Sequence, residues 1–347
     1  MGKRFQSLMM CAMLTCASGA VRADEYEDGA AAAQRGDYAM ALKLLSALAQ
    51  KGDAKAQTGL GNLYQQGRGV PRDYTEATKW YRLAAEQGYT KAETTLGVMY
   101  YVGNGVPQDY KEAMKWYRLA AEQGDAAAQL NLCSMYYNGD GIAQDYNEAI
   151  KWCGLSAQQG YAPAQTSLGI MSYTGNGVVQ DYKEAMKWFS LAAVQGDAKA
   201  QANLGNLYEN GLSVAQDYEQ AVKWYRLAAE QGYAAAQTSL GHMYMEGLGV
   251  AQDYEQAVKW YRLAAEQGYA GAQGSLGIMY QKGRGVPEDS VRAHMWFNLA
   301  ATLSSGDVEK FAIARREGIS KGMTAAQIEQ AQEMARECLE SKFRSCD

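Results

Sequence analysis

The stretch "DYKEAMKWYRLAAEQG" at residues 109–124 returns almost unchanged at 73–88, 217–232 and 253–268. The seven tryptophans of the chain follow the same rhythm, because consecutive members are all 36 residues apart. They are Trp80, Trp116, Trp152, Trp188, Trp224, Trp260 and Trp296. An active site needs residues in unique positions, so repetition on this scale indicates a chain built from stacked copies of one unit rather than an enzyme.

The unit at residues 53–88 predicts a pair of helices. Its first half, "DAKAQTGLGNLYQQG", spaces apolar residues by three and four, as one face of a helix requires. Gly67 and Gly69 end this helix, because glycine adopts left-handed backbone conformations at little cost. Asp73 begins the second helix as its N-cap, and Glu76 stands three residues later, as in a capping box.

The repeated aromatic and small residues predict the core. Alanines beside large aromatic side chains let neighbouring helices interlock, and no stretch alternates polar and apolar residues as a strand would. Trp80 and its counterparts are therefore expected in the core rather than in a ligand-binding aromatic box, and Lys79 is expected to pair with carboxylates such as that of Glu76. One helical pair cannot cover both its apolar edges, so we expect an all-α fold in which the copies stack into an α-solenoid.

The recurring residues closely resemble the Sel1-like repeat, a relative of the tetratricopeptide repeat, over about residues 37–304. The residues that carry the resemblance are Leu60–Gly61, Tyr64, Gly67-x-Gly69-Val70, Asp73–Tyr74, Ala77, Trp80, Ala84–Ala85 and Gly88. The resemblance implies a right-handed α-solenoid of helix-turn-helix repeats that binds other proteins and is not an enzyme. It also implies an exported bacterial protein, because exported members are common in this family.

The first residues resemble a signal peptide over residues 1–23. Two basic residues precede a short apolar run, and Val21 and Ala23 occupy the −3 and −1 positions of a cleavage site. The mature chain would then begin at Asp24 and be periplasmic or secreted, without inserting into a membrane. The alternative is an apolar start to a cytosolic protein.

The rest of the chain divides into three predicted parts. Residues 24–52 predict an N-terminal capping pair of helices, residues 53–306 hold seven repeats, and residues 307–347 predict C-terminal capping helices and a tail. Such caps are expected because the end of a solenoid would otherwise expose an apolar edge.

The charge of the chain excludes some partners. Without the predicted signal peptide the chain has 30 basic and 38 acidic residues. It contains no block of five or more lysines and arginines, so nucleic acid and acidic lipid surfaces would find no complementary charge. We expect a monomer whose partner is another protein or a peptide segment.

One hairpin carries two cysteines in place of other residues. Cys133 stands where the other repeats have glycine, and Cys153 stands where they have tyrosine or phenylalanine. This paired change suggests that the aromatic residue normally covers the glycine across the two helices. In an oxidising compartment the pair either forms a disulfide or remains as two packed thiols. Cys338 and Cys346 are a second pair, whose bridging would need the tail to fold back.

The sequence offers no convincing catalytic, metal or cofactor site. The two histidines, His242 and His294, have no metal-ligand partner at helical spacing. "GISKG" at residues 318–322 matches Gly-x-Ser-x-Gly, but that motif needs a strand before it, whereas here it joins two predicted helices. The repeated Gly-x-Gly-Val segments lack the Gly-Lys-Ser/Thr ending of a phosphate loop.

Partner recognition is expected at positions that vary between repeats. By analogy with tetratricopeptide proteins, the first helix of each pair lines a concave groove, which the positions equivalent to Thr58, Asn62 and Gln65 face. The candidate partner-binding residues are Val98, Tyr101, Leu130, Tyr137, Ile170, Tyr173, Asn206 and His242. Their three tyrosines share one position in consecutive repeats and would form an aromatic stripe that anchors a peptide. The alternative is that these tyrosines merely pack along the solenoid.

The expected function is a non-enzymatic scaffold or adaptor in the cell envelope that binds a protein or peptide in its groove. An alternative of another class is a cell-wall-associated hydrolase, or a binder of peptidoglycan or β-lactam, as the resemblance to some exported family members implies. The absence of a convincing nucleophile–base pair in the sequence argues against the hydrolase. A purely structural spacer is a third possibility, and it predicts no saturable partner.

Overall fold

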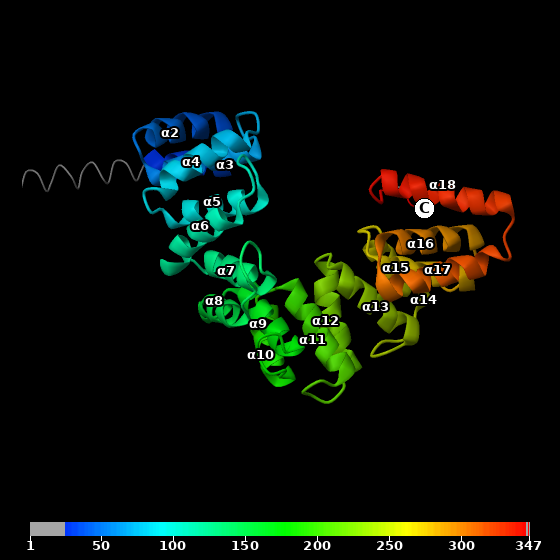
Figure 1. The fold of residues 1–347 in the computed structure, drawn as a ribbon. Helices are drawn as coiled ribbons and strands as arrows, with labels where there is room; N and C mark the ends of the chain where they lie inside the picture. Colours follow the sequence, from blue (N-terminus) through cyan, green and yellow to red (C-terminus); the bar gives the residue numbers. More distant parts are fainter. Residues whose placement is uncertain (1–24, 345, 347) are drawn as a thin grey trace, which may run out of the picture. The chain divides into compact units, whose positions relative to one another are not determined.

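The computed structural model describes residues 25–344 and Cys346. These residues form α-helices joined by short loops, and no strand occurs among them. Figure 1 shows the helices following one another in chain order within each part of the molecule. The all-α prediction is confirmed, whereas the predicted signal peptide over residues 1–23 lies outside the described residues.

Two compact units make up the chain, and the first ends at Ala164. Its described part begins with a helix over residues 25–34. The helices that follow are α2 (Tyr38–Gln50), α3 (Ala54–Gln66), α4 (Tyr74–Ala85), α5 (Thr90–Val102), α6 (Tyr110–Glu122), α7 (Ala126–Asn138) and α8 (Tyr146–Gln158). The second unit begins at Gln165, within α9 (Ala162–Thr174). Its further helices are α10 (Tyr182–Ala193), α11 (Ala198–Asn210), α12 (Tyr218–Glu230), α13 (Ala234–Glu246), α14 (Tyr254–Ala265), α15 (Ala270–Lys282), α16 (Ser290–Leu303), α17 (Gly306–Ser320) and α18 (Ala325–Glu340).

Helices pack in the order of the chain. Within one pair α3 packs on α4, and α4 then packs on α5 of the next pair. The same alternation continues to α8 in the first unit and runs from α10 to α16 in the second. Each pair therefore covers the apolar edge of its neighbour, which confirms the α-solenoid stacking of 36-residue helical pairs within each unit.

Local rules set the limits of the helices. Gly67 caps α3 in the left-handed conformation, with φ of 67°, and Asp73 accepts a hydrogen bond from the Glu76 backbone N–H at 2.9 Å. The Glu76 carboxylate pairs with Lys79 Nζ at 2.7 Å, as expected for this lysine. The predicted capping box is therefore only half formed here, because the lysine one turn along the helix takes the carboxylate that would have returned to the N-cap.

The glycine that recurs at the position of Gly61 in the first helix lies under an aromatic ring of the second helix. A Cβ atom on Gly61 would lie 2.7 Å from the Tyr81 ring, and one on Gly97 would lie 2.5 Å from the Tyr117 ring. The same pairing occurs at Gly169–Phe189, Gly205–Tyr225, Gly241–Tyr261 and Gly277–Phe297. Any side chain at the glycine would collide with the ring, so the glycine is what allows the two helices to interlock.

The hairpin of α7 and α8 departs from this pairing, because Cys133 and Cys153 form a disulfide there. Their Cα atoms lie 5.3 Å apart, and both residues are buried. The bond spans the two helical positions at which a glycine and an aromatic ring meet in the other repeats. A second disulfide joins Cys338 to Cys346, so the C-terminal tail folds back toward α18.

The tryptophans lie in the contacts between helices. Trp116, Trp152 and Trp296 are 7%, 8% and 0% exposed, and the other four are half-buried. Lysine side chains cover some of the ring surface that remains, as Lys115 does where its Nζ lies 5.4 Å from the centroid of Trp116. All seven indoles therefore contribute apolar burial to the stacking, although only three of them are buried as core residues in the way that the sequence predicts for the whole series.

Buried glutamines tie each repeat to its neighbours. Gln57 donates from Nε2 to the carbonyl oxygen of Ala49 at 3.2 Å, and its Oε1 accepts from Gln87 Nε2 at 2.7 Å. The same two bonds recur at Gln129, Gln201 and Gln237. One partner lies on the preceding helix and the other in the turn after the following helix, so each of these buried amides joins three consecutive segments with its polar groups satisfied.

The last two helices close the second unit. Both α17 and α18 pack on α16, and Ala331 and Ala335 of α18 share a buried cluster with Met295 and Leu299 of α16. Leu299 is 1% exposed, whereas Leu263 at the equivalent position of the preceding repeat is 39% exposed. Every earlier repeat has lysine at the position of Met295. Methionine replaces lysine at position 295 because this side chain is buried, and a buried lysine would lose its hydration.

Candidate functional site

The predicted partner-binding residues lie on first helices of successive repeats, and they are divided between the two units. The first unit holds Val98 and Tyr101 on α5, and Leu130 and Tyr137 on α7. The second unit holds Ile170 and Tyr173 on α9, Asn206 on α11 and His242 on α13. Val98 is 37% exposed and the other residues of the set are half-buried. We call the positions equivalent to Thr58, Asn62 and Gln65 the variable face.

In the first unit the tyrosines of the variable face take part in packing. Tyr101 donates a hydrogen bond from its hydroxyl to Asp140 Oδ2 at 2.7 Å, and its ring centroid lies 5.2 Å from that of Tyr110. The hydrogen bond to Asp140, with burial adding to it, raises the pKa of Tyr101 to about 12. Tyr137 makes a similar ring contact with Tyr146 at 5.3 Å. Each ring therefore joins two helices while part of it stays exposed.

The second unit brings two of the predicted residues into direct contact. The Tyr173 hydroxyl donates to Asn206 Oδ1 at 3.0 Å. Beside them the Tyr225 hydroxyl, from α12, donates to Glu209 Oε2 at 2.5 Å. Burial, followed by the hydrogen bond to Glu209, raises the pKa of Tyr225, so this hydroxyl remains a donor at neutral pH.

The side chains of Tyr173, Asn206 and Tyr225 border a surface depression of about 260 Å³. We call it the α11 depression, and its lining residues are Tyr173, Ala202, Asn203, Asn206, Tyr225, Tyr233, Ala235 and Ser239. Hydroxyl and amide groups alternate there with ring and methyl surface. Such a lining can hydrogen-bond to a peptide backbone and accept small apolar side chains at the same time.

The sequence predicts Tyr173 and Asn206 at this site, but it assigns Tyr225 to the core alone. Tyr225 does cover Gly205, yet the far end of its ring reaches the α11 depression. The sequence feature that could have assigned Tyr225 to this site is its hydroxyl, because Phe189 fills the equivalent core position without one. The other six predicted residues do not line the α11 depression.

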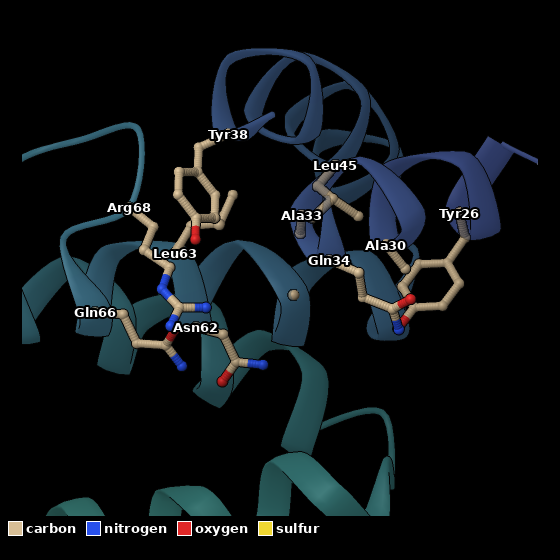
Figure 2. Close-up of a pocket in the computed structure, with 11 residues that line it drawn as sticks. Tyr26, Ala30, Ala33, Gln34, Tyr38, Leu45, Asn62, Leu63, Gln66 and Arg68 are labelled. Atoms are coloured by element: carbon tan, nitrogen blue, oxygen red, sulfur yellow. The ribbon is translucent and has the colours of Figure 1, made fainter. Parts of the chain in front are cut away.

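A second pocket, of about 240 Å³, opens between the helix at residues 25–34, α2 and α3 (Figure 2). We call it the N-terminal pocket, and its lining residues are Tyr26, Ala30, Ala33, Gln34, Tyr38, Leu45, Gly59, Asn62, Leu63, Gln66 and Arg68. Asn62 of this set is one of the residues that define the variable face, and Ala30 and Ala33 hold the corresponding places on the helix at residues 25–34. The two pockets thus lie in different units and share the position of Asn62, which Asn206 holds in the second unit.

The described residues hold few groups suited to catalysis. Among residues 25–344 and Cys346, no cluster of three or more His, Cys, Asp or Glu side chains could hold a metal ion. Ser320 of the "GISKG" stretch ends α17, and its hydroxyl donates to the carbonyl oxygen of Arg316 at 2.7 Å. It therefore lies in a helix rather than in the strand-to-helix turn of a nucleophile elbow. No helix in the same part of the chain has the length and apolarity to cross a bilayer.

The repeated sequence identifies the family of the chain. The Sel1 repeat model matches residues 20–53, 54–89, 90–125, 126–161, 162–197, 198–233, 234–269 and 270–305. The chain belongs to the Sel1 repeat family. Sel1 repeats form a fold that generally mediates interactions between proteins. The first matched segment overlaps residues 24–52, for which the sequence predicts a capping pair of helices.

One solved structure agrees with the membership in this family, and a second can be compared over most of the chain. A Sel1 repeat protein from Oxalobacter formigenes is 36% identical, with a TM-score of 0.67, over 70% of this chain and 99% of that one. A protective antigen of uropathogenic Escherichia coli strains with an SLR fold is 29% identical over 96% of this chain and 95% of that one, with a TM-score of 0.43. No curated protein sequence matches this chain.

Proposed function

We propose that this Sel1 repeat protein is a non-enzymatic, monomeric scaffold of the cell envelope that binds an extended segment of another protein on its variable face. The observation that carries the proposal is the α11 depression, where Tyr173, Asn206 and Tyr225 place polar groups around an open apolar space. An extended segment needs this combination, because its main chain supplies hydrogen bonds and its side chains supply specificity.

The distribution of charge favours a segment with little net charge. In the second unit the positions equivalent to Thr58, Asn62 and Gln65 hold one acidic residue, Glu209, and no lysine or arginine. Charged pairs lie instead on the second helices, as between Lys187 and Glu184 at 3.1 Å. Recognition on the variable face would therefore depend on local hydrogen bonds and burial rather than on long-range attraction.

Crosslinking from a defined position tests the scaffold function. A photoreactive amino acid in place of Asn203, within the α11 depression, is expected to capture another protein at one mapped segment in the producing cells. The same amino acid in place of Leu227, which is 45% exposed on α12, is the control. Capture from position 203 alone supports the proposal, whereas capture from neither position or equally from both contradicts it.

Export is tested by the N-terminus of the mature protein. The buried disulfide between Cys133 and Cys153 fits an oxidising compartment, and the sequence places the cleavage site before Asp24. Protein recovered from the envelope fraction should therefore begin at Asp24. A chain that remains in the cytoplasm with residues 1–23 attached would overturn this part of the proposal.

A further inference from the structure

The N-terminal pocket exists because the first repeat departs from the glycine–aromatic pair of the later repeats. A Cβ atom on Gly29 would lie 3.0 Å from Leu45 Cδ2, just as one on Gly61 would lie 2.7 Å from the Tyr81 ring. Gly29 and Leu45 are therefore the first repeat's version of this pair. Leucine is shorter than tyrosine, so the space that the outer half of an aromatic ring fills elsewhere stays open here.

Three further positions around the pocket are small as well. Gly59 stands where the later repeats have Thr95, Asn131, Ser167, Asn203, Ser239 and Ser275. Ala30 and Ala33 follow Gly29 at the spacing at which Asn62 and Gln65 follow Gly61. The floor of the pocket is thus apolar. At all four of its positions the side chain is smaller than the residue usual in the later repeats.

The rim of the pocket supplies hydrogen-bond donors and a positive charge. Asn62, Gln66 and Arg68 line the pocket, and Figure 2 shows the Arg68 guanidinium, from the loop after α3, near the side chains of Asn62 and Gln66. Arg68 is held in place by Tyr38, because its guanidinium carbon lies 5.5 Å from the centroid of that ring. Asn62 is anchored by the Tyr81 hydroxyl at 2.7 Å.

The pocket differs in charge from the rest of the chain. The chain has 38 acidic and 33 basic residues, yet the residues that line the pocket include Arg68 and no aspartate or glutamate. A guanidinium beside two side-chain amides matches a carboxylate, which accepts several charge-assisted hydrogen bonds. The apolar floor of the same pocket matches an uncharged side chain.

We propose that the N-terminal pocket binds the free C-terminal end of a polypeptide whose last residue is apolar, with its carboxylate on Arg68 and its side chain over Leu45 and Gly59. In a C-terminal residue the carboxylate and the side chain branch from one carbon, so a single residue can fill both parts of the pocket. An internal aspartate or glutamate carries its carboxylate at the tip of the side chain and would leave the apolar floor empty. The inference rests on the proposed function, because it specifies the chemistry of a protein segment that the scaffold binds within its first unit.

Fluorescence anisotropy with three labelled tetrapeptides tests the chemistry of the ligand. The probes are Gly-Ser-Ala-Leu with a free carboxylate, the same peptide as its C-terminal amide, and Gly-Ser-Ala-Glu as its C-terminal amide. We expect the free acid to bind the whole purified chain about tenfold or more tightly than either amide. Equal affinity for the leucine acid and amide, tighter binding of the glutamate probe, or no saturation below about 1 mM overturns the inference.

Matched variants locate the binding. Arg68→Gln should weaken binding of the free acid about tenfold or more. Arg284→Gln should leave it unchanged, because Arg284 has the same place in a Gly-x-Gly-Val loop and stacks on Tyr254 at 5.3 Å but does not line the pocket. Equal loss in both variants would show a general effect of charge and would overturn the assignment.

Filling the pocket gives a test that does not involve charge. Leu45→Tyr restores the residue of the later repeats and should abolish binding of the free acid, with folding checked by circular dichroism. Gly59→Ser narrows the pocket less severely, since the added Cβ atom meets Leu45 Cδ1 at 3.2 Å. It is the pocket-filling variant to use if Leu45→Tyr does not fold. Undiminished binding in a folded pocket-filling variant contradicts the inference. If the acid and amide bind alike while position 203 captures a partner, the inference fails and the scaffold proposal stands.

Discussion

At the scale of single residues, the repeats show which backbone positions require glycine. Ser213 has a φ of 67° in the loop position that Gly249 occupies in the next repeat. A Cβ atom on Gly249 would lie 2.3 Å from the carbonyl oxygen of Tyr218, so the position is unfavourable for any side chain. Ser213→Gly is expected to raise the free energy of unfolding by about 1 kcal/mol, measured by urea denaturation.

The reverse exchange is the control for this prediction. Gly249→Ser should lower the free energy of unfolding by at least about 1 kcal/mol, because the serine would have to adopt a left-handed conformation against a backbone oxygen. If Ser213→Gly is no more stable than the parent protein, the loop has adapted to serine and the argument from strain does not hold.

A second residue, Glu93, stands where neighbouring repeats have a buried glutamine. It is 3% exposed and accepts a hydrogen bond from Gln123 Nε2 at 2.7 Å. Burial raises the pKa of its carboxyl, an effect that the bond from Gln123 partly offsets. A carboxylate also cannot donate to a carbonyl oxygen as the amide of Gln129 does to Ala121.

The pH dependence of stability follows from this raised pKa. The folded pKa lies above the unfolded one, so the contribution of Glu93 to stability is fully present below the unfolded pKa and is lost as the pH rises through the folded pKa. Glu93→Gln should therefore be more stable than the parent at pH 7 and about equal to it near pH 4. Thermal melts at the two pH values check this. An advantage that is the same at both would exclude ionisation as its cause.

At the scale of elements, the disulfide between α7 and α8 replaces a packing contact by a covalent one. The bridge joins residues 20 positions apart, for which the loss of chain entropy in the unfolded state predicts about 3 kcal/mol of stabilisation. Cys133→Ser/Cys153→Ser should lose about this amount in guanidinium denaturation. Cys133→Gly/Cys153→Tyr should recover most of it, because it restores the pair seen at Gly97 and Tyr117. Equal loss in both variants would show that the two arrangements are not interchangeable.

The helices could be predicted from sequence because their signals are local. Asp73 and Gly67 define helix ends through neighbours within a few residues, and the change at Cys133 and Cys153 reveals the contact between two helices. The hydrogen bonds of the buried Gln57 amide could not be predicted, since its partners lie 8 and 30 residues away, on the preceding helix and in the turn after the following one. Periodicity within one unit does not determine which carbonyl oxygen such a side chain will meet.

At the scale of the whole molecule, repeated and variable positions have separate roles. Repeated residues such as Trp116 lie in helix contacts, whereas Asn206 and Tyr173 stand at positions whose residue varies among the repeats, and they border an open depression. The family could be predicted because the same residues recur in every unit. The two pockets could not, because one depends on the reach of the Tyr225 hydroxyl and the other on three small residues together with a leucine in place of tyrosine.

Two variants measured side by side test this separation of roles most directly. Tyr173→Phe/Asn206→Ala is expected to remove partner capture from position 203 while lowering the free energy of unfolding by only about 1 kcal/mol. Trp116→Ala is expected to lower it by about 3–5 kcal/mol and to leave capture by the folded protein intact. The reverse result, in which the tryptophan is needed for capture but not for stability, would contradict the account.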